Sequence, residues 1–400
     1  MRAVVYHGAN DLRVETVPVP RLGPGELLVR VAVCGVCPTD IKKIQYGTVP
    51  PPRIFGHETA GTIVRVGGGA SVPASRFKVG DRVALHHHVP CLDCHFCRHH
   101  AFAQCETYKR TGVTAGFEPA GGGYAEFVRV MPFVLPGVVK IPDRNTFAEG
   151  ALLEPVNTVL KAVKRLNLLR NDVVIVAGQG PIGLLFTRLL RLAGARVIAT
   201  DLLAPRLKLA KKFGARWTCL PQIGRAEHRR PALPLSAPKR GEGGRRPGEV
   251  LSTLVRRATL GRGLDAAIIA VPSDAAVQQA LQLVRGAGQV LLFAHTKRNQ
   301  PIASGRAELP LRQAPEHRRP FSLDLSSICL DEKDLIGSYS SDFTLQAEVA
   351  RLVFSRRLDV RPLITHRFPL EQTAAAIRLA ANPTEHSLKI VVEGTPYRRP

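Results

Sequence analysis

The segment that most constrains the fold runs from residue 172 to residue 203, DVVIVAGQGPIGLLFTRLLRLAGARVIATDLL. An apolar run, a glycine-rich turn, an amphipathic stretch and a second apolar run follow one another. This order is typical of a strand, a turn, a helix and a parallel strand. The turn reads Gly178-x-Gly180-x-x-Gly183. It predicts a Rossmann unit, an α/β fold built on a doubly wound parallel sheet.

The glycine turn also predicts a dinucleotide site. The first glycine allows the tight turn, the second lets a pyrophosphate approach the backbone at the helix N-terminus, and the third allows close packing of helix on strand. Pro181 and Ile182 begin the helix here and are expected in the same site. Asp201 ends the second apolar run, where a carboxylate accepts hydrogen bonds from ribose hydroxyls and repels a 2′-phosphate. We therefore expect NAD, with NADP as the less favoured alternative because Arg206 could accommodate a 2′-phosphate.

A dense cysteine segment, CLDCHFCRHHAFAQC, has the spacing C-x2-C-x2-C-x7-C formed by Cys91, Cys94, Cys97 and Cys105. Two-residue gaps let successive thiolates turn onto one ion, and four thiolates complete a tetrahedral zinc shell with no open position. We expect a structural zinc site, with an iron–sulfur cluster as the less favoured alternative. An ion held in this way braces the chain and does no chemistry.

The compartment expected for the chain supports this interpretation. The first residues, MRAVVYHGAN, contain no apolar segment of signal-peptide length. No run of about 18 or more apolar residues occurs, so we expect no membrane span. A cytoplasmic location is therefore expected, where thiols stay reduced and clustered cysteines bind metal. The length of 400 residues exceeds what one core usually supports, which predicts two domains.

Three further segments carry candidate ligands for a second metal site. CGVCPTD contains Cys37 and Thr39 and follows an alternating apolar run that predicts a strand. GHETAGTIVRVGGGA contains His57 and Glu58, and LLEPVNTVLKAV places Glu154 at the start of an apolar-periodic helix. Each segment is weak evidence alone, because a lone cysteine on a strand is usually a core residue and a His-Glu pair is usually a solvated turn.

Taken together, these motifs resemble those of the zinc-containing medium-chain alcohol dehydrogenases, especially the sorbitol, threonine and related polyol dehydrogenase branch. The family's zinc signature matches Gly56-His57-Glu58-x2-Gly61-x5-Gly67-x2-Ala70 across its whole length. The four-cysteine segment corresponds to the family's structural zinc lobe. The resemblance covers nearly the whole chain and implies a GroES-like, β-rich catalytic domain beside the Rossmann domain.

The expected domain organisation is discontinuous. The catalytic domain covers residues 1–155, with the structural-zinc lobe at about 90–106. The Rossmann domain covers residues 156–337, and the chain returns to the catalytic domain at 338–400. Strands are expected at 264–271 and 288–295, with a helix in AAVQQALQLV between them, and the last strand of this sheet is expected at 335–340. A further helix is expected in LQAEVARLVFSRRLDV.

The resemblance implies roles for the residues of the second site. Cys37 and His57 become zinc ligands, and Glu58 and Glu154 become carboxylates near the metal. Which glutamate binds directly stays open. Asp40 would orient His57 through the second ring nitrogen. A site with three ligands keeps one position for substrate, so the chain is expected to hold two zinc ions, one catalytic and one structural.

The implied activity is oxidation of a secondary alcohol, a polyol or an amino alcohol such as threonine to the ketone by hydride transfer to NAD. Zinc would act as a Lewis acid on the substrate hydroxyl, and Thr39 would pass on the proton. Thr158 corresponds to a position near the nicotinamide. Lys42 stands where many relatives carry histidine, so the outer proton relay stays open. The resemblance also implies a homotetramer or homodimer that acts on a small-molecule alcohol.

The net charge of +24 raises the question of nucleic acid. Residues 221–249 contain seven Lys or Arg against three Glu, and residues 297–320 contain six against two. Both segments are rich in Pro, Gly and Arg, resemble solvated loop insertions and lack aromatic residues for base stacking. We expect no specific nucleic-acid partner. The histidines at 86–88 are expected to be structural or to line a cleft, since neighbours on a strand face opposite sides.

Other classes of protein remain as alternatives. A zinc-free quinone or enoyl reductase shares the fold but should lack the four-cysteine lobe and the pair formed by Cys37 and His57. An NADP-linked alcohol dehydrogenase or reductase of the same fold is a second alternative. A third is an inactive zinc- and dinucleotide-binding protein that contacts anionic partners through its basic loops.

Overall fold

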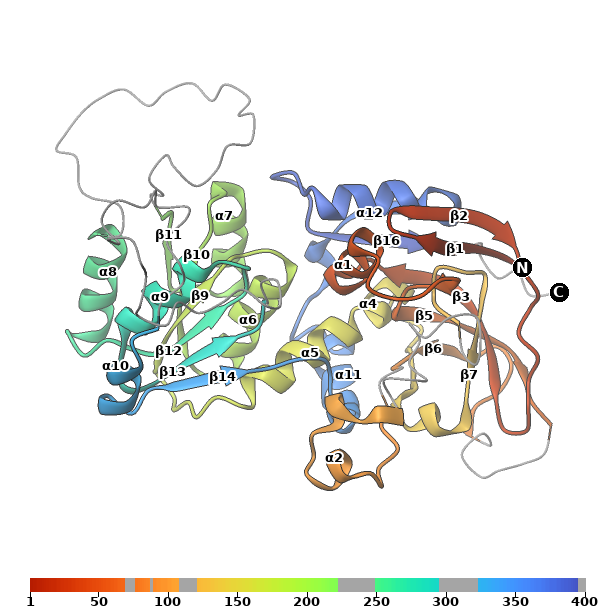
Figure 1. The fold of residues 1–400 in the computed structure, drawn as a ribbon, viewed down its shortest axis with the longest axis horizontal. Helices are drawn as coiled ribbons and strands as arrows, with labels where there is room; N and C mark the ends of the chain where they lie inside the picture. Colours follow the sequence, from red (N-terminus) through yellow and green to blue (C-terminus); the bar gives the residue numbers. More distant parts are fainter. Residues whose placement is uncertain (69–75, 87–88, 108–120, 222–248, 295–322, 395–400) are drawn as a thin grey trace, which may run out of the picture. The chain divides into compact units, whose positions relative to one another are not determined.

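The computed structural model describes residues 1–68, 76–86, 89–107, 121–221, 249–294 and 323–394 (Figure 1). The predicted basic insertions, the histidines at 87–88 and Ala70 lie outside these residues, apart from residues 221 and 249 at the ends of the first insertion. The chain forms two compact units. Unit 1 contains Met1–Lys161 and Tyr339–Pro400, and unit 2 contains Ala162–Ser338. The domain boundaries stated above stay a prediction.

Unit 1 is rich in strands, and its described residues form two sheets. The larger sheet has the order β15-β16-β3-β5-β6-β8, with β7 also pairing with β3, and the smaller has the order β2-β1-β4. The strands are β1 (Arg2–Gly8), β2 (Asp11–Thr16), β3 (Leu27–Gly35), β4 (Arg53–Ile54), β5 (Glu58–Val66), β6 (Arg82–Ala84), β7 (Phe127–Val130), β8 (Val139–Lys140), β15 (Ile364–Pro369) and β16 (Lys389–Glu393).

Strand β3 organises the part of unit 1 that carries the site. Two strands far apart in the sequence, β5 and β16, both pair antiparallel with it. Gly35 at the end of β3 is opposite Glu58 on one side and opposite Val391 on the other. The end of β3 therefore brings together the start of β5 and the C-terminal strand β16.

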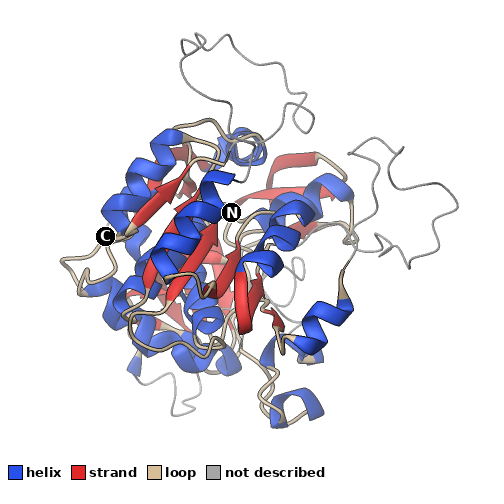
Figure 2. Ribbon diagram, turned by 90° about the vertical axis from the view of Figure 1, so that its left-hand side faces the viewer, coloured by secondary structure: helices blue, strands red, loops and turns tan. Residues whose placement is uncertain are grey.

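Unit 1 also contains helices and short 3-10 turns. Figure 2 distinguishes the helices from the strands by colour. The α-helices are α1 (Pro38–Tyr46), α2 (His95–Arg98), α4 (Phe147–Ala151), α5 (Leu153–Val163, which ends in unit 2), α11 (Gln346–Phe354) and α12 (Thr373–Ala381). The 3-10 turns are η2 (Phe102–Gln104), η4 (Pro132–Gly137), η6 (Phe343–Leu345), η7 (Arg361–Leu363) and η8 (Leu370–Gln372).

Unit 2 contains a sheet in which every described strand pair is parallel. Its order is β11-β10-β9-β12-β13-β14, which is 3-2-1-4-5-6 when the strands are counted along the chain. This order defines the Rossmann fold and confirms the predicted fold class. The strands are β9 (Val173–Ala177), β10 (Arg196–Thr200), β11 (Trp217–Cys219), β12 (Leu264–Ile269), β13 (Val284–Leu292) and β14 (Asp334–Gly337).

Helices lie on both faces of this sheet, with α6 and α7 on one face and α8 and α9 on the other (Figure 1). A sheet covered on both faces favours strands that are largely apolar. Every residue of β12 is buried, and Asp265 is the one charged residue in it. The helices of unit 2 are α6 (Pro181–Leu192), α7 (Ala204–Phe213), α8 (Glu249–Thr259), α9 (Asp274–Leu283) and α10 (Leu325–Leu330).

The elements expected from the sequence of unit 2 are present, with different bounds. Strand β12 ends at Ile269 rather than at residue 271, and β14 ends at Gly337 rather than at residue 340. Strand β13 begins at Val284 rather than at residue 288, because Val284 pairs with Leu264 before the register shifts. In the described part of the chain, none of the helices has both the length and the apolar character that a bilayer span requires.

Candidate metal and dinucleotide sites

Three of the predicted zinc ligands lie together in unit 1. Cys37 follows β3 and is the N-cap residue of α1, His57 directly precedes β5, and Glu58 is the first residue of β5. One ligand atom of each residue, the sulfur, a ring nitrogen and a carboxylate oxygen, lies within 4.8 Å of the other two. Three protein ligands of this kind leave a fourth position open on zinc, as catalytic sites require.

The glycine at the end of β3 makes room for the carboxylate. A Cβ atom on Gly35 would lie 1.9 Å from Oε2 of Glu58, so a larger residue would displace the carboxylate. Oε2 is buried and has no hydrogen-bond partner among the described residues. A buried carboxylate oxygen without a partner is costly unless a cation compensates it. The residues present therefore fit a bound metal ion.

Asp40 lies against the imidazole of His57. Oδ1 of Asp40 lies 3.2 Å from Nδ1 of His57, and the Asp40 side chain is fully buried. Contact at Nδ1 leaves Nε2 as the nitrogen that would bind an ion. Burial lowers the pKa of His57, but the negative charges of Asp40 and Cys37 outweigh it and raise the pKa well above its ordinary value.

Lys389, the first residue of β16, is a site residue that the sequence analysis missed. Its buried ammonium donates to Oε1 of Glu58 at 2.5 Å and to the carbonyl of Val36 at 2.9 Å. Burial lowers the pKa of Lys389, but the negative charges of Glu58 and Cys37 outweigh it and raise the pKa. The only local signal is a lysine at the start of the apolar run KIVVE.

Glu154 lies near this cluster but is not part of its ligand set. It is the second residue of α5, and its Oε1 accepts a hydrogen bond of 3.4 Å from the hydroxyl of Thr158. Burial raises the pKa of Glu154 to about 7; the charge of Glu58 adds to this rise, whereas His57 and Lys389 oppose it. These interactions place Glu154 beside the cluster.

The hydrogen bond of Thr158 and the position of Thr39 do not test the roles predicted for these two residues. Thr158 donates to the carbonyl of Glu154, which is a bond within its own helix. Thr39 is half-buried in the first turn of α1, two residues after Cys37. The proton-transfer role of Thr39 and the nicotinamide contact of Thr158 stay predictions.

The four cysteines of the predicted cage converge at α2 and η2. Sγ of Cys97 lies 3.9 Å from that of Cys91 and 3.5 Å from that of Cys94. Four sulfurs bound to zinc at about 2.3 Å are roughly 3.8 Å apart, so these separations fit one tetrahedral ion. Backbone N–H groups, led by that of Asp93, lower the pKa of Cys91 to about 6. The backbone N–H of Cys91 donates to Sγ of Cys105 at 3.4 Å, which ties the two ends of the segment together.

In unit 2 the glycine turn has the geometry of a pyrophosphate site. Gly178 has φ +90°, and a Cβ on Gly183 would lie 1.8 Å from the carbonyl oxygen of Gly178. Gly180 is the N-cap of α6, directly before Pro181, and a Cβ added to it would meet no atom within 4 Å. The turn is therefore closed where α6 approaches β9 and open at Gly180, where backbone groups can approach a phosphate.

Asp201 lies beside this turn. It follows β10, its Oδ2 accepts the backbone N–H of Gln179 at 2.6 Å, and its Oδ1 accepts that of Leu203 at 2.9 Å. Nη1 of Arg206 is 3.9 Å from Oδ2 of Asp201. The carboxylate is thus held at the carboxyl ends of the strands, where dinucleotides bind in this fold. Ile182, the second residue of α6, is half-buried.

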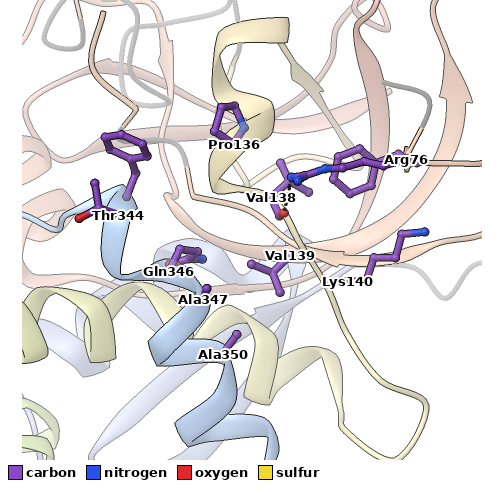
Figure 3. A pocket seen from close by; sticks show the side chains of 11 residues that line it. Arg76, Pro136, Val138, Val139, Lys140, Thr344, Gln346, Ala347 and Ala350 are labelled. Atoms are coloured by element: carbon purple, nitrogen blue, oxygen red, sulfur yellow. Dashed lines mark hydrogen bonds between the residues drawn. The ribbon is translucent and has the colours of Figure 1, made fainter. Parts of the chain in front are cut away.

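A cavity of about 640 Å³ in unit 1 is separate from these sites (Figure 3). Gln346, Ala347 and Ala350 of α11 face Val139 and its neighbours across it. Its described lining consists of Arg76, Phe77, Pro136, Val138, Val139, Lys140, Phe343, Thr344, Gln346, Ala347 and Ala350. None of these is a predicted site residue, and none is a cysteine, a histidine or a carboxylate.

Removal of hydride from an alcohol carbon needs an acceptor and a group that stabilises the oxygen. A chain that folds a Rossmann domain and brings together three candidate zinc ligands has residues that fit both needs. These features define the class of zinc- and NAD(P)-dependent alcohol dehydrogenases.

The comparisons with known proteins agree with this class. Residues 23–143 match the alcohol dehydrogenase GroES-like domain, and residues 181–353 match the zinc-binding dehydrogenase domain. Sorbitol dehydrogenase of Bombyx mori is 31% identical over 397 residues, covering 98% of both chains. Sorbitol dehydrogenase of Bacillus subtilis is 29% identical and covers 98% of this chain and 97% of its own. The chain belongs to the zinc-containing medium-chain alcohol dehydrogenase family, in its polyol branch.

A solved structure supports the fold. A zinc-binding dehydrogenase of Sinorhizobium meliloti 1021, bound to NADP, superimposes with a TM-score of 0.76 at 24% identity and covers 98% of each chain. The chain is thus an alcohol or polyol dehydrogenase that depends on zinc and NAD(P), as predicted. An inactive binding protein is not favoured.

Proposed function

We propose that the chain oxidises a secondary hydroxyl group of a polyol, or of an amino alcohol such as threonine, to a ketone with NAD. The carrying observation is the cluster of Cys37, His57 and Glu58 ligand atoms within 4.8 Å of one another. The sorbitol dehydrogenases among the relatives support a polyol as the first substrate to test.

In this proposal, Cys37, His57 and Glu58 bind the catalytic zinc directly. When bound, zinc supplies Lewis acidity toward the substrate hydroxyl, and NAD accepts the hydride. Asp40 holds the imidazole of His57 in one orientation, and Lys389 does the same for the carboxylate of Glu58. Both are positioning residues, because they act through a ligand.

Two further residues have proposed roles around the reacting groups. Glu154 is buried beside the cluster without belonging to its ligand set, which supports a role through water or by exchange with Glu58. Thr39 is proposed to take the proton of the substrate hydroxyl. The outer proton relay, where Lys42 replaces the usual histidine, is not assigned.

The preference for NAD over NADP rests on Asp201. Its two oxygens accept hydrogen bonds from backbone N–H groups on either side, which supports a fixed carboxylate that binds the adenosine ribose hydroxyls. A 2′-phosphate would meet this negative charge. In this proposal, Asp201 accepts hydrogen bonds from the ribose hydroxyls, and Arg206 lies close to the adenosine.

The cysteine cage is proposed to hold a second, purely structural zinc. A homotetramer or homodimer and a cytoplasmic location complete the proposal. These two rest on the family resemblance and on the reduced thiols that the cage requires.

The proposal is tested by measuring NADH formation with sorbitol-like polyols, threonine and short secondary alcohols, in parallel with zinc content. Activity with a polyol or an amino alcohol that disappears in Cys37→Ser and persists in Cys329→Ser supports the proposal. Cys329 is exposed and far in sequence from the cluster, so its replacement controls for loss of a thiol. Turnover that survives in Cys37→Ser would refute the proposed site.

A further inference from the structure

Two histidines on the outside of the cysteine cage have no role in the proposed reaction. His95 is the first residue of α2, and His99 is its C-cap residue. Residues four apart on a helical turn lie on the same face. The backbone N–H of His99 donates to the carbonyl of His95 at 3.3 Å, so the turn between them is closed.

The two imidazoles are at a separation that fits one shared ion. Their ring centroids are 4.5 Å apart with an angle of 53° between the ring planes. A ring nitrogen binds a transition metal at about 2.1 Å, so two rings bound about 90° apart on a square-planar or tetragonal ion have centres roughly 4.6 Å apart. Both side chains are exposed, so an ion can reach them without opening the lobe.

The cage holds this pair in place. Cys94 is the N-cap of α2, directly before His95, and Cys97 lies between the two histidines. The sulfurs of Cys94 and Cys97, which fit the structural zinc, therefore hold the start and the middle of the turn that carries the pair. A pair that is organised in advance loses little conformational entropy when an ion binds.

Among the neighbouring side chains, Phe96 lies edge-on to His95 with ring centroids 5.8 Å apart. Arg98, which lies between the histidines in sequence, pairs with Asp93 at 3.0 Å. His100 packs instead against Phe102, with ring centroids 5.7 Å apart. His100 therefore offers a matched control in the same loop.

We propose that His95 and His99 form a third metal site, which binds a divalent transition ion such as Ni²⁺ or Cu²⁺ at the surface. Imidazole suits these ions, whereas Mg²⁺ and Ca²⁺ prefer oxygen ligands. Two protein ligands leave the remaining positions to water or to a donor from another molecule. This site differs from the cage, which is closed, and from the cluster at Cys37, which is buried.

Calorimetric titration of the zinc-loaded full-length chain with Ni²⁺ tests the proposal. We expect His95→Asn and His99→Asn each to lose about one bound Ni²⁺ per chain relative to wild type, since one imidazole alone binds weakly. His100→Asn and His386→Asn keep the wild-type number; asparagine also tolerates the positive φ of residue 100. Other histidines that bind Ni²⁺ contribute equally to every variant.

Zinc content is measured on the same samples. An unchanged zinc content in His95→Asn and His99→Asn shows that the cage is intact and assigns the lost ion to the pair. A wild-type chain that binds no Ni²⁺ would overturn the proposal. So would variants of both histidines that bind as much Ni²⁺ as His100→Asn.

Discussion

The ammonium of Lys389 lies 2.5 Å from Oε1 of Glu58, although 331 residues separate them in the sequence. Lys389 is 5% exposed and Glu58 is 1% exposed. The pair exists because β5 and β16 lie on opposite sides of β3 and both reach the end of that strand. The C-terminal strand thus supplies the cation that fixes a carboxylate of the proposed zinc site.

Replacement of this cation is expected to destabilise the fold and the site together. Lys389→Met leaves the carboxylate of Glu58 buried without its partner, which costs about 3–5 kcal/mol in the free energy of unfolding. Loss of a group that orients a metal ligand also lowers metal affinity or kcat/KM by about 10–100-fold. Urea denaturation and steady-state kinetics measure the two effects. Lys389→Arg keeps the charge and should retain most of both, whereas a Lys389→Met chain as stable and active as wild type would contradict the prediction.

The two zinc sites are expected to separate by mutation. Cys37→Ser should lower the zinc content from about two ions per chain to about one and abolish turnover. Its effect on thermal stability should be small, because a zinc site with an open coordination position is catalytic rather than structural. Cys94→Ser should also remove about one ion but mainly lower the melting temperature. Metal analysis, kinetics and thermal denaturation give the comparison. The assignment fails if Cys94→Ser abolishes turnover without loss of stability.

Cofactor preference is expected to follow the charge of Asp201. Asp201→Asn keeps an oxygen that accepts a backbone N–H but removes the negative charge that a 2′-phosphate would meet. We expect the ratio of kcat/KM for NADP to that for NAD to rise by about tenfold or more, which corresponds to roughly 1.4 kcal/mol. Asp172→Asn, in the same unit before β9, serves as the control. An unchanged ratio in Asp201→Asn would remove Asp201 from the specificity site.

Glu149 predicts how stability depends on pH. Its carboxylate accepts hydrogen bonds from the backbone N–H of Thr146 at 2.7 Å and from Asn145 at 2.9 Å, and Arg356 lies 3.2 Å away. Burial raises the pKa of Glu149, but these donors outweigh it and hold the pKa below the ordinary value of 4.5. The stabilisation is therefore complete above pH 4.5 and is lost as the pH falls through the lowered pKa.

Glu149→Gln should lower the free energy of unfolding by about 1.5–3 kcal/mol at neutral pH. The difference from wild type should shrink as the pH falls below 4.5, because wild-type Glu149 then becomes neutral as well. Urea denaturation over a series of pH values measures it. The exposed Glu371→Gln provides the comparison, and a difference that grows in acid would show that the sign is wrong.

The Rossmann unit could be predicted from the sequence because its signals are local. The glycine turn, the helix and Asp201 lie within one contiguous segment, and the bond between Gln179 and Asp201 forms inside it. The cysteine cage is local in the same sense. Short spacing leaves the chain few ways to arrange such residues.

The cluster at Cys37 could be predicted only in part. The resemblance supplied four acidic, cysteine and histidine candidates, but the spacing along the chain does not say which glutamate lies within reach of the sulfur. Glu58 does so because it is opposite Gly35 in the register of β3 and β5. The contact of Lys389 with Glu58 depends on a third strand, β16. No local sequence pattern predicts the order of strands in a sheet.

A substitution at Gly180 is expected to affect coenzyme binding without affecting the stability of the fold. No atom lies within 4 Å of the position that a Cβ on residue 180 would take. An alanine at this position would therefore cause no steric clash in the coenzyme-free chain. In the proposed dinucleotide site, that methyl group would occupy the position at which the pyrophosphate approaches the backbone. A screen of variants for solubility or thermal stability would not detect the effect of this substitution. Only an assay of coenzyme binding would detect it.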